Sequence, residues 1–298
     1  MLTIDPKETP IPLLHKHLLG AIGPRPIAFA STVDENGVPN LSPFSFFNCF
    51  GANPPILIFS PARSGRTGNT KDTYNNVKKI PEVVINTVNY DIIQQVSLAS
   101  CPFQPEVNEF QKSGLTPIPS DLVRPFRVKE SHVQMECKVL EVRETGTGGA
   151  AGNLIICEVI KMHINEDVLG EDGLIDQHKI DLVSRMGGNW YCHSNSASMF
   201  EIPKPITTIG IGYDAIPEDI RLSTILSGND LGKLGGIEAL PDETEVNDYK
   251  LLELADIFIS FNENPKDLEI ELHKLAKNLL EKNNIEDAWK TLLAFNNQ

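Results

Sequence analysis

Residues 27–48 read IAFASTVDENGVPNLSPFSFFN and carry the clearest fold signal in the chain. Residues 27–33 are apolar or bear small hydroxyl side chains, and half of them are β-branched or aromatic, which is typical of a strand. Residues 34–39 are dense in turn-forming Asp, Asn, Gly and Pro. The stretch therefore predicts a β-hairpin in which residues 27–33 pair with residues 40–48.

Short strands continue along the chain on both sides of a polar stretch. Residues 55–60 (PILIFS) and 83–88 (VVINTV) are rich in branched apolar side chains and are bounded by Pro or Asn. Between them, residues 62–79 are polar and predict a loop that leads into a short helix. Strands separated by loops and few strong helices favour an antiparallel barrel over repeated βαβ units.

Two longer strands form a second predicted hairpin around a Gly-rich tip at residues 145–153. In residues 134–143 the apolar phase changes by one residue after Val139, which indicates a β-bulge. Residues 154–164 are apolar on both faces of the expected strand. Such a strand belongs in a barrel wall or under an oligomer interface. We therefore expect a mainly β fold with flanking helices.

The chain changes character near residue 200, where Pro203 and Pro205 mark a joint. Two amphipathic helices are expected beyond it, one from Pro265 to about residue 279 and one at 285–295. Their apolar stripes are narrow, so we expect them to dock on the barrel or on a partner subunit. We therefore divide the chain into a barrel domain, 1–200, and a partly helical extension, 201–298.

Charge is distributed unevenly between these two parts. The whole chain of 298 residues has a formal net charge of −14. Residues 1–200 carry 17 basic and 21 acidic side chains, whereas residues 201–298 carry 9 and 19. A net acidic chain disfavours nucleic acid and anionic membranes as partners. The nearly balanced first part could still bind an anionic ligand locally.

Cysteine usage and hydropathy indicate a cytoplasmic protein. The five cysteines are an odd set without a CxxC pair, as expected of reduced thiols. The first ten residues lack the basic and apolar regions of a signal peptide. No apolar run approaches the roughly 20 residues that span a bilayer. We expect no membrane association.

Common catalytic and nucleotide-binding motifs are missing from the sequence. Residues 65–71 (GRTGNTK) lack the Gly-Lys pair of a P-loop, and residues 210–215 lack the third glycine of a dinucleotide fingerprint. There is no GxSxG or HExxH motif. The histidines are scattered, with His15 and His17 interpreted as strand or loop residues, and we expect no metal site.

A group of small and hydroxyl residues in the first part indicates a ligand site. Ala28, Ala30 and Thr32 would share a small strand face that a flat group could approach closely. Lys71-Asp72-Thr73 follows a loop rich in Gly, Ser and Thr, and hydroxyls, backbone N–H groups and a lysine suit a phosphate monoester. The same tripeptide could instead serve only to cap the helix that starts there. Residue types alone leave both possibilities open.

Several blocks in consistent order resemble the flavin reductase-like, FMN-binding split-barrel family. The resemblance covers roughly residues 10–200, and residues 201–298 match no family by inspection. The matching blocks are GPRPIAFAST (23–32), NLSPFSFFN (40–48), NPP (53–55), KDT (71–73), FQKSGLT (110–116), RVKES (127–131), MEC (135–137) and RMGGNWYCH (185–193). The resemblance implies a six-stranded antiparallel Greek-key split barrel and a homodimer with FMN at the subunit interface.

The resemblance also implies roles for particular residues. The end of the first long strand would lie near the flavin, residues 40–45 would follow the ring edge, and residues 71–73 would hold the phosphate. The late block would close over the site, with His193 as a possible proton donor or gate. Gly188 belongs to the late block as well. The implied cofactor-binding residues are Ser31, Thr32, Asn40, Leu41, Ser42, Phe44, Ser45, Ser60, Lys71, Asp72, Thr73, Gly187 and Tyr191.

Three functions are compatible with these features. The first is an oxidoreductase that passes a hydride from NAD(P)H to bound FMN, in which the cofactor supplies the chemistry and no protein nucleophile is needed. The second is an FMN carrier or redox sensor without turnover, which needs the same cradle. The third is a scaffold whose acidic extension recruits partners. Flavin absorbance of the purified protein separates the third from the others.

Overall fold

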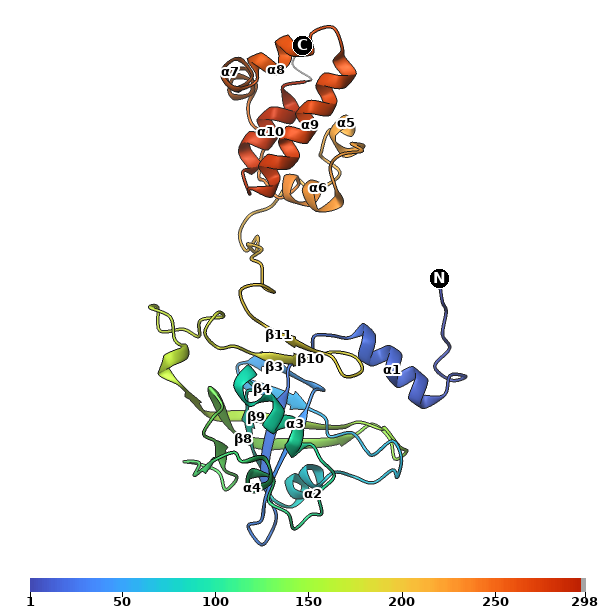
Figure 1. Ribbon diagram of the computed structural model, residues 1–298, viewed down its shortest axis with the longest axis vertical. Helices are drawn as coiled ribbons and strands as arrows, with labels where there is room; N and C mark the ends of the chain where they lie inside the picture. Colours follow the sequence, from blue (N-terminus) through green and yellow to red (C-terminus); the bar gives the residue numbers. More distant parts are fainter. Residues whose placement is uncertain (296–298) are drawn as a thin grey trace. The chain divides into compact units, whose positions relative to one another are not determined.

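The computed structural model describes residues 1–295, which form two compact units, residues 1–200 and the residues from 201 onward. The first unit is built around a curved antiparallel sheet with helices against it (Figure 1). Its sheet strands are β1 (Ala28–Val33), β2 (Pro39–Phe44), β3 (Phe47–Ala52), β4 (Pro55–Phe59), β5 (Glu82–Asn86), β8 (Val133–Glu144) and β9 (Asn153–Ile164). Its helices are α1 (Ile11–Ala21), α2 (Asp72–Lys79), α3 (Ile93–Ala99) and α4 (Glu109–Ser113).

Shorter elements complete this unit. Two-stranded ribbons pair β6 (Pro117–Ile118) with β7 (Arg127–Val128) and β10 (Val183–Arg185) with β11 (Tyr191–His193). The 3₁₀ turns are η1 (Tyr90–Ile92) and η2 (Glu166–Val168).

The order of strands in the sheet is β2-β1-β5-β8-β9-β4-β3. β2 and β3 lie at opposite edges of the sheet although only Ser45 and Phe46 separate them in the chain. The sheet must therefore curl until its two edges approach one another, which confirms the expected antiparallel split barrel. Within the described residues, the main sheet has seven strands rather than six, because the bend at Ser45 and Phe46 divides the predicted strand 40–48 into β2 and β3.

The barrel interior is filled by small and large apolar side chains from most strands. Ala28 and Ala30 are fully buried there, packed in one cluster with Phe44, Phe59 and Ile85. The expectation that a flat group approaches this small face is therefore wrong, because core side chains cover it. Phe29, on the opposite face of β1, belongs to a second cluster formed with α3 and α4.

The β8–β9 hairpin confirms the predicted bulge. The pairing register shifts between Val139 and Glu141, and again between Glu136 and Cys137. Each shift turns the following side chains relative to the partner strand.

The N-terminal segment differs from the sequence interpretation. Residues around His15 and His17 form helix α1 rather than strand or loop. None of its residues is buried, although Ile11 and Leu18 are large apolar side chains. The alternation of the two histidines therefore misled the interpretation, because the segment is a helix whose apolar residues are at most partly buried within the described chain.

The second unit is helical. Its elements are α5 (Glu218–Arg221), α6 (Gly228–Leu234), α7 (Glu243–Glu253), α8 (Ala255–Ser260), α9 (Pro265–Glu281) and α10 (Ile285–Leu293). The predicted helices α9 and α10 are present and lie side by side (Figure 1). Part of predicted helix 285–295 runs past the end of α10, and residues 296–298 lie outside the described part of the chain.

The apolar stripes of α9 and α10 are buried within their own unit, whereas we expected the barrel or a partner subunit to cover them. Leu280 and Trp289 pack against Ile220 and Leu234 of the same unit, and the indole N–H of Trp289 donates to the Leu234 carbonyl at 3.1 Å. The short helices between residues 218 and 260, which we did not predict from the sequence, cover the apolar stripes. Within residues 1–295, no helix combines the length and apolar character that crossing a membrane requires.

Candidate functional site

A buried polar network joins β1, β2 and α2 at one end of the barrel. The Asn40 side-chain carbonyl accepts hydrogen bonds from the hydroxyls of Thr73 (2.8 Å) and Thr32 (3.3 Å). The Asn76 amide donates to Thr32 at 3.1 Å, and the Asn40 amide donates to Glu109 at 3.2 Å. All five side chains are buried. The network fixes the start of α2 against the edge of the sheet, so its hydroxyls serve the protein itself.

Glu109 anchors this network from α4. Its carboxylate also accepts the backbone N–H of Leu41 at 3.1 Å. Burial raises the pKa of Glu109, and the hydrogen bonds from Leu41 and Asn40 oppose that shift. The outward N–H of strand β2 at Leu41 is therefore occupied by protein.

The N-terminus of α2 is uncapped. Lys71 occupies the N-cap position with extended backbone, and its side chain makes no capping hydrogen bond to the helix. The N–H groups of the first turn, which starts at Asp72, have no acceptor within the helix, because no helical carbonyl precedes them. The Lys71 side chain is exposed, Asp72 is partly exposed, and the Thr73 hydroxyl is used by Asn40. The tripeptide therefore does not cap the helix, and its free donors are the Lys71 ammonium and backbone N–H groups.

The loop that precedes Lys71 is fastened to the β8–β9 tip. Ser60 Oγ accepts the N–H of Asn153 at 3.0 Å, and the Asn153 amide donates to the Pro61 carbonyl at 3.0 Å. The Arg63 N–H donates to the Ala151 carbonyl at 2.9 Å. Ser60 is thus buried and already bonded to the protein. These contacts hold the loop that presents Lys71.

Five buried polar side-chain atoms in the described chain have no hydrogen-bond partner. They are Ser31 Oγ, Arg63 Nε, Asn89 Oδ1, Ser131 Oγ and Asn153 Oδ1. Arg63 and Asn153 belong to the fastened loop and tip. Buried donors and acceptors are normally paired, so unpaired ones in this segment, together with the uncapped helix, fit an absent polar ligand.

The predicted ring-edge residues fall into two groups. Leu41 and Phe44 are buried in the two core clusters, so their side chains contribute packing. Ser42 and Ser45 are partly exposed at the far half of β2 and at the bend after it. The Ser45 hydroxyl lies 3.5 Å from Nε of Arg25.

Arg25 ties the end of α1 to the β10–β11 ribbon. Its guanidinium donates to the carbonyls of Leu19 (2.9 Å), Ile22 and Met186 (2.9 Å). Burial and the nearby charge of Arg185 lower the pKa of Arg25. The last carbonyls of α1 offer partial negative charge to this buried cation.

Gly187 fits the same junction for a steric reason. A Cβ at this position would lie 3.0 Å from the Gly20 Cα. A side chain at this position would push the loop after β10 away from the backbone at the end of α1, so glycine is favoured. Gly188 has a φ of +58°, which also favours glycine. Both residues therefore shape the loop after β10.

His193 lies on β11 with its ring held on three sides. Its Nε2 is 2.5 Å from Asp181 Oδ1, its Nδ1 is 3.3 Å from Nδ2 of Asn195, and its ring stacks on Tyr90 with centroids 4.2 Å apart. On the same ribbon, the Arg185 guanidinium lies 4.4 Å from the ring centre of Tyr191. Two contacts described above flank β2. Thr73 binds Asn40 near the start of the strand, and Arg25 lies 3.5 Å from Ser45 just past its end.

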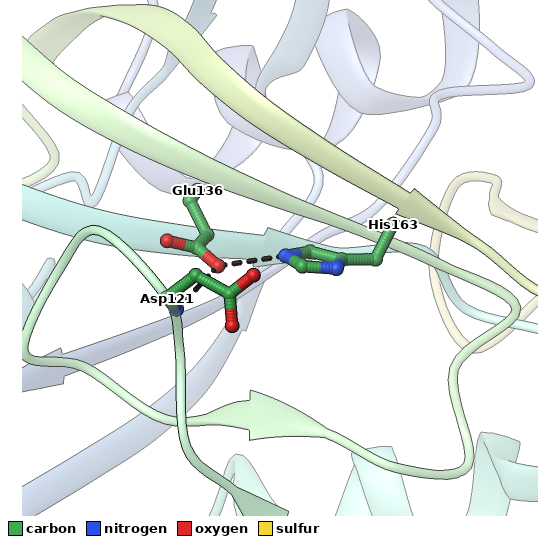
Figure 2. Close-up of side chains that lie close together, drawn as sticks. All are labelled: Asp121, Glu136 and His163. Carbon is green, nitrogen blue, oxygen red and sulfur yellow. Dashed lines mark hydrogen bonds and ion pairs between the residues drawn. The ribbon is translucent and has the colours of Figure 1, made fainter.

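A separate cluster of possible metal ligands is formed by Asp121, Glu136 and His163, whose donor atoms lie within 4.8 Å of one another (Figure 2). The buried Glu136 carboxylate accepts the N–H groups of Asp121 (2.8 Å) and Leu122 (2.7 Å) and contacts His163 Nε2 at 2.7 Å.

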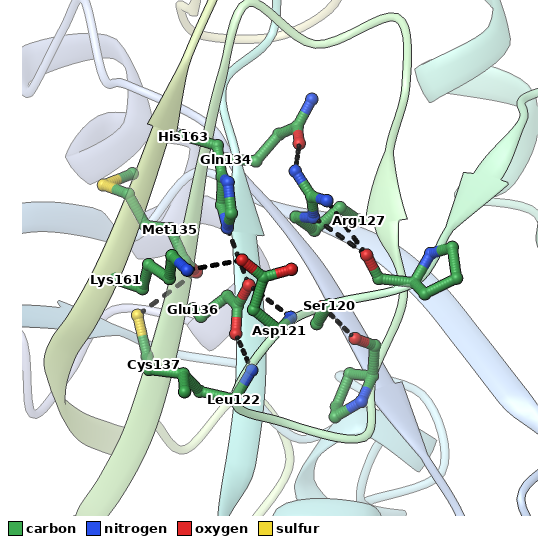
Figure 3. Close-up of polar contacts among 12 residues, drawn as sticks. Ser120, Asp121, Leu122, Arg127, Gln134, Met135, Glu136, Cys137, Lys161 and His163 are labelled. Atoms are coloured by element: carbon green, nitrogen blue, oxygen red, sulfur yellow. Dashed lines mark hydrogen bonds and ion pairs between the residues drawn. The ribbon is translucent and has the colours of Figure 1, made fainter.

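Lys161 already supplies a cation to this cluster through its ion pair with Asp121 (Figure 3). Burial disfavours the Glu136 charge, but the hydrogen bonds from Asp121, His163 and Leu122 outweigh it and lower the pKa of Glu136. The arrangement fastens the loop before β7 onto β8.

Comparison with known proteins assigns the first unit to a family. The model of the flavin reductase like domain matches residues 21–181, which is more than half of the chain. The chain belongs to this family. Membership supports a flavin-related function, and residues 201–298 lie outside the match.

Relatives of this flavin reductase-like chain cover the same part. An uncharacterized protein of Aquifex aeolicus is 37% identical over 186 residues, which are 62% of this chain and 92% of the relative. An uncharacterized protein of Halalkalibacterium halodurans is 37% identical over 179 residues, 59% of this chain and 85% of the relative.

Two solved structures share the fold of the flavin reductase-like unit. Nitrilotriacetate monooxygenase component B from Bacillus cereus is 31% identical with a TM-score of 0.63, covering 68% of this chain and 98% of that chain. The 2-nitrobenzoate 2-nitroreductase of Pseudomonas fluorescens, 22% identical with a TM-score of 0.59, covers 68% of this chain and 96% of its own and shows the same fold.

Sequence reasoning missed several residues of this flavin reductase-like site. Asn76 and Glu109 complete the buried network, Arg25 joins the ribbon to the barrel, and Tyr90 and Asp181 hold His193. Arg25 belongs to the family block at residues 23–32, but its hydrogen-bond partners are evident only from the fold. Asp181, with a φ of +54°, carried a conformational signal that sequence does not display.

Proposed function

We propose that the unit of residues 1–200 binds FMN and passes a hydride to it from NAD(P)H. The observation that carries the proposal is the uncapped N-terminus of α2, with the exposed Lys71 beside it. Backbone N–H groups at a helix N-terminus and a lysine are suited to a phosphate monoester. The family match supports a flavin. FMN ends in a phosphate monoester, so it is the flavin that we propose for these donors.

The remaining residues fit the other parts of FMN. The strand from Asn40 to Ser45 spans about 16 Å at the usual rise of about 3.3 Å per residue, enough to run beside an extended mononucleotide. Ser42 and Ser45 would present small polar groups to the ring edge, and the network around Thr73 keeps α2 in place. Bound FMN would supply the hydride-accepting chemistry, while the chain positions it and limits water.

We also propose a homodimer with the site at the subunit interface. Ile160 and Met162 of β9 are 41% and 48% exposed, and α1 has no buried residue. Uncovered apolar surface of this kind supports an oligomer contact. A cytoplasmic location remains a prediction that cell fractionation would test.

Anaerobic titration of the purified full-length protein with NADH and NADPH tests the main proposal. Loss of the visible flavin absorbance with stoichiometric reductant is the expected result. A flavin-loaded protein that neither nucleotide reduces would favour the alternative of an FMN carrier or redox sensor. A colourless protein that binds no added FMN would refute both.

A further inference from the structure

Both ring nitrogens of His193 are occupied by the protein. Because Asp181 is a carboxylate acceptor, Nε2 of a neutral His193 donates to it, and Nδ1 accepts from the Asn195 amide. One ring face is covered by Tyr90. The part of His193 left for a ligand is therefore its other ring face, and the side chain is 30% exposed.

Asp181 fixes this arrangement from two directions. Its Oδ1 accepts from His193, while its Oδ2 lies 3.3 Å from the backbone N–H of Tyr90. The Tyr90 N–H also donates to the Asp181 carbonyl at 3.1 Å. Asp181 thus holds the His193 ring and the Tyr90 backbone, and the two rings stack on each other.

A cation lies on the same face of the ribbon. Val183 pairs with His193 and Arg185 with Tyr191, so Arg185 and His193 share a face, on cross-strand pairs two residues apart. Diagonal cross-strand neighbours of this kind lie about 7–8 Å apart. Among the contacts of the described residues, Arg185 uses Nη1 to hold the Trp190 carbonyl at 2.9 Å and packs on Tyr191. Within residues 1–295, its other N–H donors have no partner, and Arg25 nearby pairs with backbone carbonyls and with no acidic side chain.

From these contacts we infer that the face of the β10–β11 ribbon that carries His193 and Arg185 binds one nucleotide of NAD(P)H, the proposed reductant. His193 serves as a stacking surface for its planar ring and Arg185 as a ligand to its phosphate, with Asp181 and Tyr90 as positioning residues. The inference rests on the proposed function and changes the expected role of His193, because a ring whose two nitrogens are engaged stacks rather than donates a proton.

Steady-state kinetics of the FMN-loaded full chain with NADH separate stacking from proton donation. We expect His193→Ala to raise KM about tenfold, as loss of one base–aromatic stack does, with kcat within about threefold. His193→Phe, which retains a flat ring, should keep KM within a few-fold. Arg185→Gln should raise KM about tenfold. His178→Ala, which removes an exposed histidine of the same unit, is the matched control.

The positioning role of Asp181 has its own pair of variants. Asp181→Asn keeps an acceptor and tolerates the positive φ, so KM should stay within a few-fold. Asp181→Ala removes the acceptor and should raise KM as His193→Ala does, with kcat and its pH profile unchanged. Equal KM values for both variants would remove Asp181 from this role.

The outcomes distinguish this inference from the proposed function. If His193→Phe loses kcat as fully as His193→Ala, and a limb of the pH profile disappears, His193 is a proton donor and the inference is wrong. If NADH does not reduce the wild-type flavin, the proposed function fails. Calorimetric binding of NAD⁺ to the same full-length variants then decides the ribbon site alone, since equal affinities for wild type and His193→Ala would overturn it.

Discussion

The hydroxyl of Thr73, the second residue of α2, donates a 2.8 Å hydrogen bond to the side-chain carbonyl of Asn40 on β2. This contact places the uncapped helix end beside the strand that the family motif identifies. Because both groups are buried, Thr73 acts within the protein, and the adjacent Lys71 remains free for a ligand.

Removal of the Thr73 hydroxyl should lower stability and affect both flavins equally. Thr73→Ala leaves the buried Asn40 carbonyl with one weaker donor, Thr32 at 3.3 Å, at a cost of about 1–3 kcal/mol of unfolding free energy. Denaturant unfolding measures this cost, and Thr73→Ser should restore most of it. FMN and riboflavin affinities should fall by the same factor. A loss confined to FMN would show that the hydroxyl contacts phosphate.

Lys71→Ala should weaken FMN binding about 10- to 100-fold and leave riboflavin binding nearly unchanged, since a charge-assisted contact contributes about 1.5–3 kcal/mol. Fluorescence titration with the two flavins measures the ratio. Lys79→Ala, at the other end of α2 and paired with Glu35, is the charge-matched control and should leave both affinities unchanged. If Lys71→Ala weakens both flavins equally, Lys71 acts through the fold.

Periodicity and turn residues were sufficient to predict the strands that build the barrel, including the β8–β9 bulge. They could not predict α1, because His15 and His17 interrupt its apolar pattern and none of its residues is buried in the unit. They also could not show that the stripe containing Trp289 packs on residues 218–260, because the partners of an apolar stripe depend on tertiary contacts.

For the candidate site, the sequence supplied blocks that resemble the family but not the contacts between them. Sequence motifs placed Lys71, Thr73 and His193 in one site, but hydrogen bonding decides which of their atoms remain available. Thr73 and His193 are engaged by Asn40 and Asp181, residues 33 and 12 positions away in the chain. Such pairings depend on strand register and loop conformation, which no local pattern encodes.

Glu136→Gln should destabilise the first unit by about 2–3 kcal/mol near neutral pH, because charge-assisted hydrogen bonds from Asp121, Leu122 and His163 are lost. Glu141→Gln, an exposed position on the same strand, is the control. Unfolding in denaturant measures both.

The pH dependence of this loss has a defined sign. The pKa of Glu136 is lowered in the folded state, so its stabilisation is complete above the unfolded value of about 4.3 and is lost as pH falls through the lower folded value. The difference between wild type and Glu136→Gln should therefore shrink below about pH 4. A difference independent of pH in that window would mean that Glu136 is not ionised in the fold.

Charged residues on the exposed face of β9 should dissociate the proposed dimer. Placing aspartates at both Ile160 and Met162 buries charge in any interface that covers these side chains, which are about half exposed in the single chain. Light scattering should change from twice the monomer mass to the monomer mass, with weaker FMN binding. Leu251→Asp, at an exposed leucine of the second unit, should leave the mass unchanged. A wild-type monomer that binds FMN tightly would refute the shared site.

Loss of the helical unit should spare the flavin site, because each unit has its own core. Trp289 is fully buried among Leu234, Leu280 and other residues of the second unit, so Trp289→Ala should cost that unit about 3–5 kcal/mol. A chain ending at residue 200 removes the unit altogether. Calorimetry of Trp289→Ala should show a lower transition for the helical unit, while FMN affinity stays within a few-fold of wild type in both proteins. Leu222→Ala, at an exposed leucine, serves as the control for the point variant. If the truncated chain is folded and soluble but has lost FMN while Trp289→Ala retains it, residues beyond 200 take part in building the flavin site.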